Sequence, residues 1–97
     1  MMKVVVDVAI VCKATNAMHK TMRKEFDTEA SLVPGMHLID SMWKKEREIT
    51  GVTYNPDDSS LYLGVTPGLE ECSTREAAAE MEELYRSAGW RAANEWD

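Results

Sequence analysis

The sequence predicts an α+β fold in which a mostly antiparallel β-sheet packs against a C-terminal α-helix. Three observations support this prediction: an alternating apolar run at the N-terminus, alternating segments around a strong central turn, and a capped helical pattern near the end. The chain has 97 residues, a length typical of one hydrophobic core, so we expect a single domain spanning 1–97. Its 44% hydrophobic content excludes a disordered chain.

The N-terminal segment, 3–12, is predicted to form a β-strand. Every second residue from Val4 to Cys12 is apolar, and the residues between them are apolar apart from Asp7. Successive side chains of a strand point to opposite faces. The pattern therefore indicates a central strand that is covered on both sides.

The next segment, 14–31, fits two patterns. A stripe that recurs every fourth residue favours a helix: Ala14, Met18, Met22, Phe26 and Ala30. Residues 22–29 also alternate, with a charged side chain at every odd-numbered position, as in a strand. Periodicity alone slightly favours the helix, and both interpretations stay open.

Turn signals divide the middle of the chain into short strands. Pro34 and Gly35 indicate a turn, which a short strand at 36–40 is expected to follow. A polar connection at 41–45 carries Trp43 and leads to the next strand.

Residues 47–65 are predicted to form a β-hairpin. Its turn is Asn55-Pro56-Asp57-Asp58, in which Pro fixes φ and the Asn and Asp side chains bond the local backbone. A bulge at Gly51 would place Ile49, Val52 and Tyr54 on one face.

The last predicted element is a helix that Ser73 is expected to cap, with Glu76 completing a capping box. Gly89 fits the position just beyond the helix, and Trp90 is expected to pack on Tyr85. The predicted buried stripe consists of Ala77, Met81, Leu84, Tyr85 and Ala88.

Negative charge is concentrated in the C-terminal part of the chain. The net charge is −6, and residues 55–97 contribute −7 while residues 1–54 contribute +1. Such a region cannot neutralise phosphates, whereas it complements a basic protein surface. The candidate partner-binding acids are Asp57, Asp58, Glu76, Glu80 and Glu83. The alternative is an ordinary solvated helix face that keeps the protein soluble.

Trp96 is a further candidate contact residue. The chain has three tryptophans, and tryptophan is enriched at the energetic centres of interfaces. Trp96 lies near the chain end, where burial within the same domain is difficult, so we expect it to contact a second copy or another protein.

No cofactor or metal site is expected. The two histidines, His19 and His37, have no metal-ligand spacing with each other or with Cys12 and Cys72. The glycines are too scattered for a phosphate-binding loop. We therefore expect no catalytic role.

No targeting or membrane segment is expected either. The apolar run at the start contains Asp7 and is far shorter than the roughly 18 residues of a membrane span. No cleavage site of small residues follows it, so we expect a cytoplasmic protein with free thiols at Cys12 and Cys72.

One stretch resembles small uncharacterised proteins of phages and mobile elements. The similar motifs are Arg23-Lys24-Glu25-Phe26, Val33-Pro34-Gly35-Met36, Trp43, and Ile49 to Asn55. The resemblance implies a compact, partly open β-sheet followed by a helix, and it favours a strand at 21–29. The acidic C-terminal helix is similar in style to anti-CRISPR proteins, which implies a short, acidic, non-enzymatic inhibitor. No functional residue is carried over, because no functional motif matches.

The expected function is that of a non-catalytic interaction protein, an anti-CRISPR-type inhibitor derived from a phage. Its acidic surface would occupy a basic groove of a host nucleic-acid-handling complex and block nucleic-acid access. One alternative is a small nucleic-acid-binding or regulatory domain that uses Lys44, Lys45 and Arg47. Another is a small enzyme with Cys12 or His37 in a shared pocket.

Overall fold

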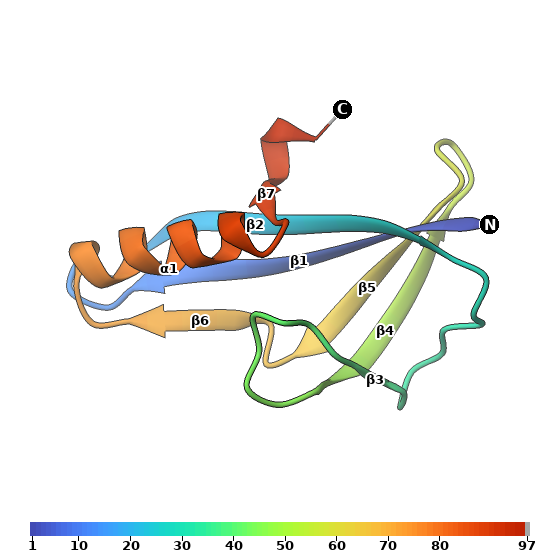
Figure 1. Ribbon diagram of the computed structural model, residues 1–97, viewed down its shortest axis with the longest axis horizontal. Coiled ribbons are helices and arrows are strands. Elements are labelled where there is room, and N and C mark those ends of the chain that lie inside the picture. Colours follow the sequence, from blue (N-terminus) through green and yellow to red (C-terminus); the bar gives the residue numbers. More distant parts are fainter. Residues whose placement is uncertain (97) are drawn as a thin grey trace.

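The computed structural model describes residues 1–96 and shows an α+β fold, as predicted (Figure 1). A seven-stranded sheet carries one helix on one of its faces. In chain order the elements are β1 (Met2–Cys12), β2 (Ala17–Thr28), β3 (His37–Leu38), β4 (Arg47–Asn55), β5 (Ser60–Thr66), β6 (Leu69–Cys72), α1 (Arg75–Ser87), β7 (Arg91–Ala92) and a 3₁₀ turn (Ala93–Glu95).

The first strand, β1, lies at the centre of the sheet. The strand order is β3-β4-β5-β1-β2-β7, and β6 pairs with β1 outside this path. Along one edge β1 pairs with β2 in antiparallel fashion. Along the other edge its N-terminal half pairs in parallel with β5 and its C-terminal half in parallel with β6. The sheet is thus mostly antiparallel, and two short strands share one side of β1.

One face of β1 is buried as predicted. Val4, Val8 and Ile10 are fully buried on the α1 side. On the opposite face Val5 is buried, whereas Asp7, Ala9 and Val11 are only half-buried. The expectation of cover on both sides is therefore only partly met.

Residues 17–28 form the strand β2, so the helix suggested by the four-residue period is wrong. Met22 lies opposite Val8 and is fully buried, and Phe26 lies opposite Val4. A long apolar strand such as β1 needs a partner for its backbone groups as well as for its side chains. Cross-strand pairing with β1 therefore outweighs the local helical period.

The hairpin of β4 and β5 contains the expected bulge. The register shifts between Ile49 and Gly51. As a result Ile49 lies opposite Val65 and Val52 opposite Leu63, which places their side chains on the same face of the sheet. The strand predicted at 36–40 is shorter, because only His37–Leu38 pairs with β4.

The helix begins one residue later than predicted. Thr74, not Ser73, is the N-cap, and its Oγ1 accepts a hydrogen bond from the Ala77 amide at 3.1 Å. Glu76 is consequently one position too early for a capping box. At the other end Gly89 follows the helix with a φ of +94°, as predicted.

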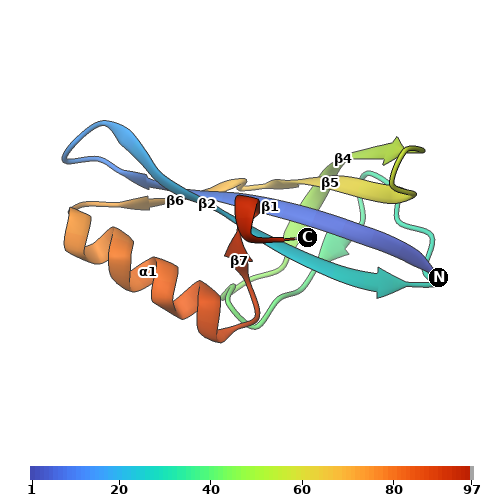
Figure 2. The same cartoon turned by 90° about the horizontal axis from the view of Figure 1, so that it is seen from above.

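The buried face of α1 follows the predicted stripe except at one residue, because Ala77, Met81 and Ala88 are partly buried against the core. Ala78 and Tyr85 are its buried residues, whereas Leu84 is 54% exposed and its predicted burial is wrong. Trp90 packs edge-on against Tyr85 with ring centroids 5.0 Å apart, which confirms that contact. Figures 1 and 2 show why the cover is partial: α1 lies over one end of the sheet, alongside β1, β2 and β6.

Within residues 1–96, no helix combines the length and apolar character that crossing a lipid bilayer requires.

Candidate protein-binding surface

The outer side of α1 carries three acidic residues that we call the acidic helix face: Glu76, Glu80 and Glu83. Their spacing of three and four residues places them on one side of the helix, away from Ala78 and Tyr85. All three are exposed, and none makes an ion pair within the part of the chain that the structure describes. Their charge therefore remains uncompensated and open to a partner.

Glu82, on the flank of the same helix, is by contrast fully engaged. It lies 2.9 Å from His19 Nε2, 3.2 Å from Lys20 Nζ and 2.8 Å from Arg86 Nη2. Partial burial acts to raise its pKa, but the hydrogen bonds from His19, Arg86 and Lys20 outweigh it and lower the pKa to about 2. Glu82 thus fastens α1 to β2 and is not part of the free acidic surface.

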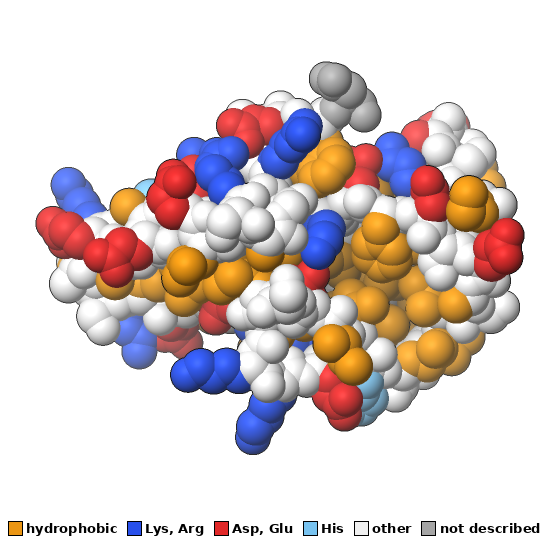
Figure 3. All heavy atoms as spheres, viewed as in Figure 1, with side chains coloured by type: hydrophobic (Ala, Val, Ile, Leu, Met, Phe, Trp, Pro, Cys, Tyr) orange, Lys and Arg blue, Asp and Glu red, His pale blue; other side chains and the backbone are white. Residues whose placement is uncertain are grey.

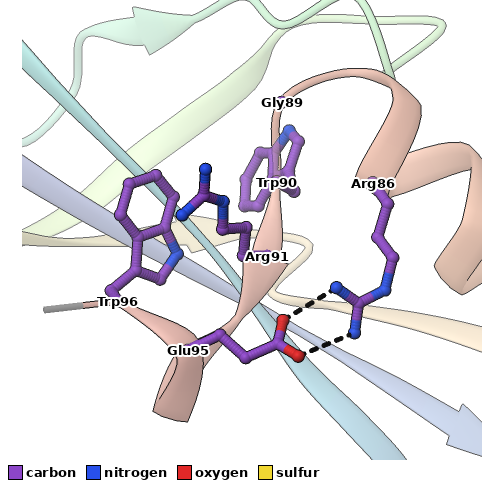
Figure 4. A pocket seen from close by; sticks show the side chains of 6 residues that line it. All are labelled: Arg86, Gly89, Trp90, Arg91, Glu95 and Trp96. Atoms are coloured by element: carbon purple, nitrogen blue, oxygen red, sulfur yellow. Dashed lines mark hydrogen bonds and ion pairs between the residues drawn. The ribbon is translucent and has the colours of Figure 1, made fainter.

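Trp96, at the end of the C-terminal segment, contacts β2 of the same molecule. Arg86 binds Glu95 through two hydrogen bonds, of 2.7 Å and 3.3 Å, and Figure 4 shows this pair beside Trp96. The Trp96 Nε1–H donates to the Arg23 carbonyl of β2 at 3.0 Å, and the Arg91 guanidinium lies 5.3 Å from its ring. The indole is half-buried, so its structural role is to dock the C-terminal segment on β2.

Asp57 and Asp58 occupy the tip of the β4–β5 hairpin, far from α1. Figures 1 and 2 show this tip and the helix at opposite ends of the molecule. Asp58 accepts hydrogen bonds from the Ser60 amide and the Tyr62 hydroxyl, which serve the turn itself. The turn and the acidic helix face are therefore two separate acidic sites and do not make one flat surface.

The basic cluster at 44–47 is divided by the fold. Arg47 is 8% exposed, and its guanidinium donates to Glu70 Oε2 at 2.8 Å and to the Pro67 carbonyl at 2.8 Å. Its charge is compensated inside the protein. Lys44 and Lys45 alone stay exposed, which weakens the case for a nucleic-acid patch at this position.

Sequence analysis missed the polar cluster to which Arg47 belongs. The Trp43 Nε1–H donates to the Tyr85 hydroxyl at 3.1 Å, and that hydroxyl donates to Glu70 Oε2 at 2.6 Å. Burial and then the bond to Glu70 raise the pKa of Tyr85 well above its usual range. Apart from the aromatic and charged residue types themselves, the sequence held no signal of this cluster.

A groove of about 700 Å³ opens between α1 and the loop 42–47. We call it the helix–loop groove. Met42, Met81 and Leu84 supply its apolar lining, and Lys44 and Lys45 stand on the loop side. Figure 3 shows hydrophobic side chains gathered along this flank of α1. The exposed Leu84, which breaks the predicted stripe, is therefore part of a hollow beside the acidic helix face.

A second apolar hollow, of about 280 Å³, lies where α1 leaves the sheet uncovered. Phe26, Ile39 and Trp90 line it, and Ile39 is 77% exposed. At its margin Lys24 Nζ lies 2.7 Å from Asp40 Oδ1. Burial acts to raise the pKa of Asp40, but the bonds from Lys24, the Met42 amide and Trp90 lower it.

His37 does not converge with the cysteines. Two strands, β4 and β5, separate β3, which carries His37, from β1, which ends at Cys12. Cys12 and Cys72 are buried free thiols that face each other across β1 and β6. Among the described residues no group of three His, Cys, Asp or Glu side chains is arranged to hold a metal ion.

Comparison of the chain with protein-family models, curated proteins and solved structures gave no match.

Proposed function

We propose that this chain is a non-catalytic protein-binding module whose acidic helix face docks on a basic protein surface. The observation that carries the proposal is the uneven compensation of its acids. Glu70, Glu82 and Glu95 are bound by arginine or lysine of the same chain. The acidic helix face is not, although it lies on a rigid helix, so its charge is preorganised for a partner.

The partner class follows from this charge. Basic protein surfaces that hold nucleic acid carry the lysines and arginines that neutralise phosphates. An anionic helix that occupies such a surface competes with the nucleic acid for the same positive charges. We therefore propose an inhibitor that blocks nucleic-acid access to a nucleic-acid-handling complex, in the manner of anti-CRISPR proteins.

The experiment uses three charge reversals, Glu76→Lys, Glu80→Lys and Glu83→Lys, in one variant. Its control carries Asp27→Lys, Glu29→Lys and Glu48→Lys, which are exposed acids outside α1 and outside the candidate binding residues, so both variants have the same net charge. A partner captured from a host lysate with the wild-type chain is then titrated with all three proteins at about 50 and about 300 mM salt.

We expect the helix variant to lose at least tenfold in affinity at low salt, while the control variant stays close to wild type. The wild-type affinity is expected to fall as salt rises, because the contact is electrostatic. Binding by the helix variant that is undiminished at both salt concentrations would refute the proposal, as would an equal loss in the control variant.

A further inference from the structure

One edge of β6 (Leu69–Cys72) is open. Within residues 1–96, β6 pairs with β1 alone, and Figure 1 shows no strand beyond it. The Gly68 carbonyl accepts a hydrogen bond from Ala9 N of β1 at 3.1 Å, and the Cys72 carbonyl accepts one from Lys13 N, just after β1, at 2.8 Å. Alternate residues of a strand direct their backbone groups to opposite edges. Leu69 and Glu71 therefore direct their N–H and C=O groups away from β1.

The helix–loop groove opens beside this edge. Pro67 and Glu70, which lie before and after Leu69 in the sequence, line the groove together with Met81 and Leu84. A strand added beyond β6 would place the residue opposite Glu70 on the α1 side of the sheet, because opposed residues share a face. That side chain would enter the groove and cover the exposed Leu84.

We infer that the β6 edge and the helix–loop groove together accept an extended segment of a protein partner as an added strand. Backbone hydrogen bonds to Leu69 and Glu71 hold such a segment, and the groove selects an apolar side chain at alternate positions. The residue next to that apolar one points to the other face of the sheet. A basic side chain is favoured there, because it lies beside the exposed Glu71.

A second copy of the chain fits this edge poorly. Two-fold antiparallel pairing centred on β6 places Glu70 or Glu71 directly opposite its own counterpart. Like charges directly opposite each other destabilise a strand pair. Glu70 is moreover already bound by Arg47 and Tyr85, which hold its side chain on the α1 side of the sheet. The charge pattern thus favours a different chain with a basic residue.

The inference rests on the proposed function, since it names the form in which a partner presents itself. It depends on other residues than the proposed function does. Substitutions in the acidic helix face test docking by charge, whereas substitutions of Glu71 and Leu84 test strand addition. The two can therefore fail separately.

The probe is a displayed library of unstructured peptides of about 12 residues, long enough to supply one strand. Peptides selected on the wild-type chain are synthesised and titrated while backbone amide signals are recorded by NMR. We expect slowed amide hydrogen exchange at Leu69 and Glu71 on binding, and we expect the selected peptides to share an apolar residue near a basic one.

Two variants and their matched controls test the contact. Glu71→Pro removes an outward N–H without touching the ladder to β1, while Glu71→Gln keeps that N–H. Leu84→Lys alters the groove, while Ala79→Lys makes the same change on the other, exposed flank of α1. We expect at least a tenfold loss of affinity for Glu71→Pro and for Leu84→Lys, and less than a threefold change for either control.

The amide spectrum of Glu71→Pro shows whether this variant folds. If it does not fold, the comparison of Leu84→Lys with Ala79→Lys still tests strand addition. A library that yields no peptide above an unrelated control protein would overturn the inference. So would selected peptides that bind both test variants as tightly as the wild type.

If the captured partner depends on the acidic helix face yet binds the Glu71→Pro and Leu84→Lys variants normally, the proposed function stands and strand addition is wrong. If selected peptides bind this edge while charge reversal leaves the partner bound, strand addition stands and the electrostatic function is wrong.

Discussion

Replacing Tyr85 by Phe is expected to lower the free energy of unfolding by about 2–4 kcal/mol. The Tyr85 side chain is fully buried, and its hydroxyl both donates to Glu70 and accepts from the Trp43 Nε1–H. Phe keeps the ring and its packing against Trp90, so the change isolates the two hydrogen bonds.

The magnitude follows from those two bonds. A hydrogen bond to a charged acceptor contributes about 1.5–3 kcal/mol, and Glu70 accepts the Tyr85 hydroxyl at only 2.6 Å. Losing the acceptor also leaves the buried N–H of Trp43 without its partner, which costs about 1 kcal/mol or more. Glu70 keeps its bond to Arg47, so the total stays below the cost of an isolated buried charge.

Urea unfolding measures the change, and the other two tyrosines supply graded controls. Tyr62→Phe removes an exposed bond to Asp58 and is expected to cost less than about 1 kcal/mol. Tyr54 is half-exposed, and Tyr54→Phe is expected to stay within about 0.5 kcal/mol of wild type. A Tyr85→Phe variant as stable as Tyr54→Phe, at an unchanged slope with urea, would show that the cluster does not stabilise the fold.

Two further predictions concern α1. The Glu82 pKa of about 2 lies below its ordinary value of 4.5, so its contribution to stability is present above pH 4.5 and is lost as the pH falls toward 2. Urea unfolding across this pH window should show a smaller loss of the free energy of unfolding for Glu82→Gln than for wild type. The Glu83→Gln variant should lose as much as wild type. An equal loss in all three proteins would show that Glu82 does not stabilise the fold in this way. Thr74→Ala should cost about 1 kcal/mol, because the Ala77 amide loses its acceptor, whereas Ser73→Ala should cost almost nothing. The reverse order in thermal or urea unfolding would place the cap at Ser73.

The elements that were predictable are those in which local and tertiary preferences agree. The apolar run of β1, interrupted only by Asp7, matches its central position, and the turn at 55–58 matches the hairpin it closes. Even the bulge near Gly51 followed from the sequence, because only a bulge places Ile49 and Val52 on one face.

The predicted secondary structure was wrong where the sequence fits two local patterns almost equally well, or where two adjacent residues can play the same role. Residues 17–28 carry both a helical and a strand pattern, and only the need of β1 for a paired edge selects the strand. Ser73 and Thr74 are adjacent and equally suited to capping, so the choice depends on where β6 ends and delivers the chain to α1.

The candidate surface was predictable in its charge but not in its extent. Glu76, Glu80 and Glu83 are exposed as their spacing indicated. Asp57 and Asp58, grouped with them by charge alone, lie at the other end of the sheet. Charge counting along the chain cannot separate two acidic sites, because the sheet decides where each of them points.

The sequence by itself determined the α+β class, the central strand β1, the hairpin and the end of α1 at Gly89, since each depends on neighbours within a few residues. Only the tertiary structure decided which charges are free. His19 lies 63 residues from Glu82 along the chain, and Arg47 lies 23 residues from Glu70. Compensation of a charge depends on distance in space, and the folding of β2 and β6 around β1 sets those distances. The acidic helix face is what remains uncompensated on α1 once these pairs have formed.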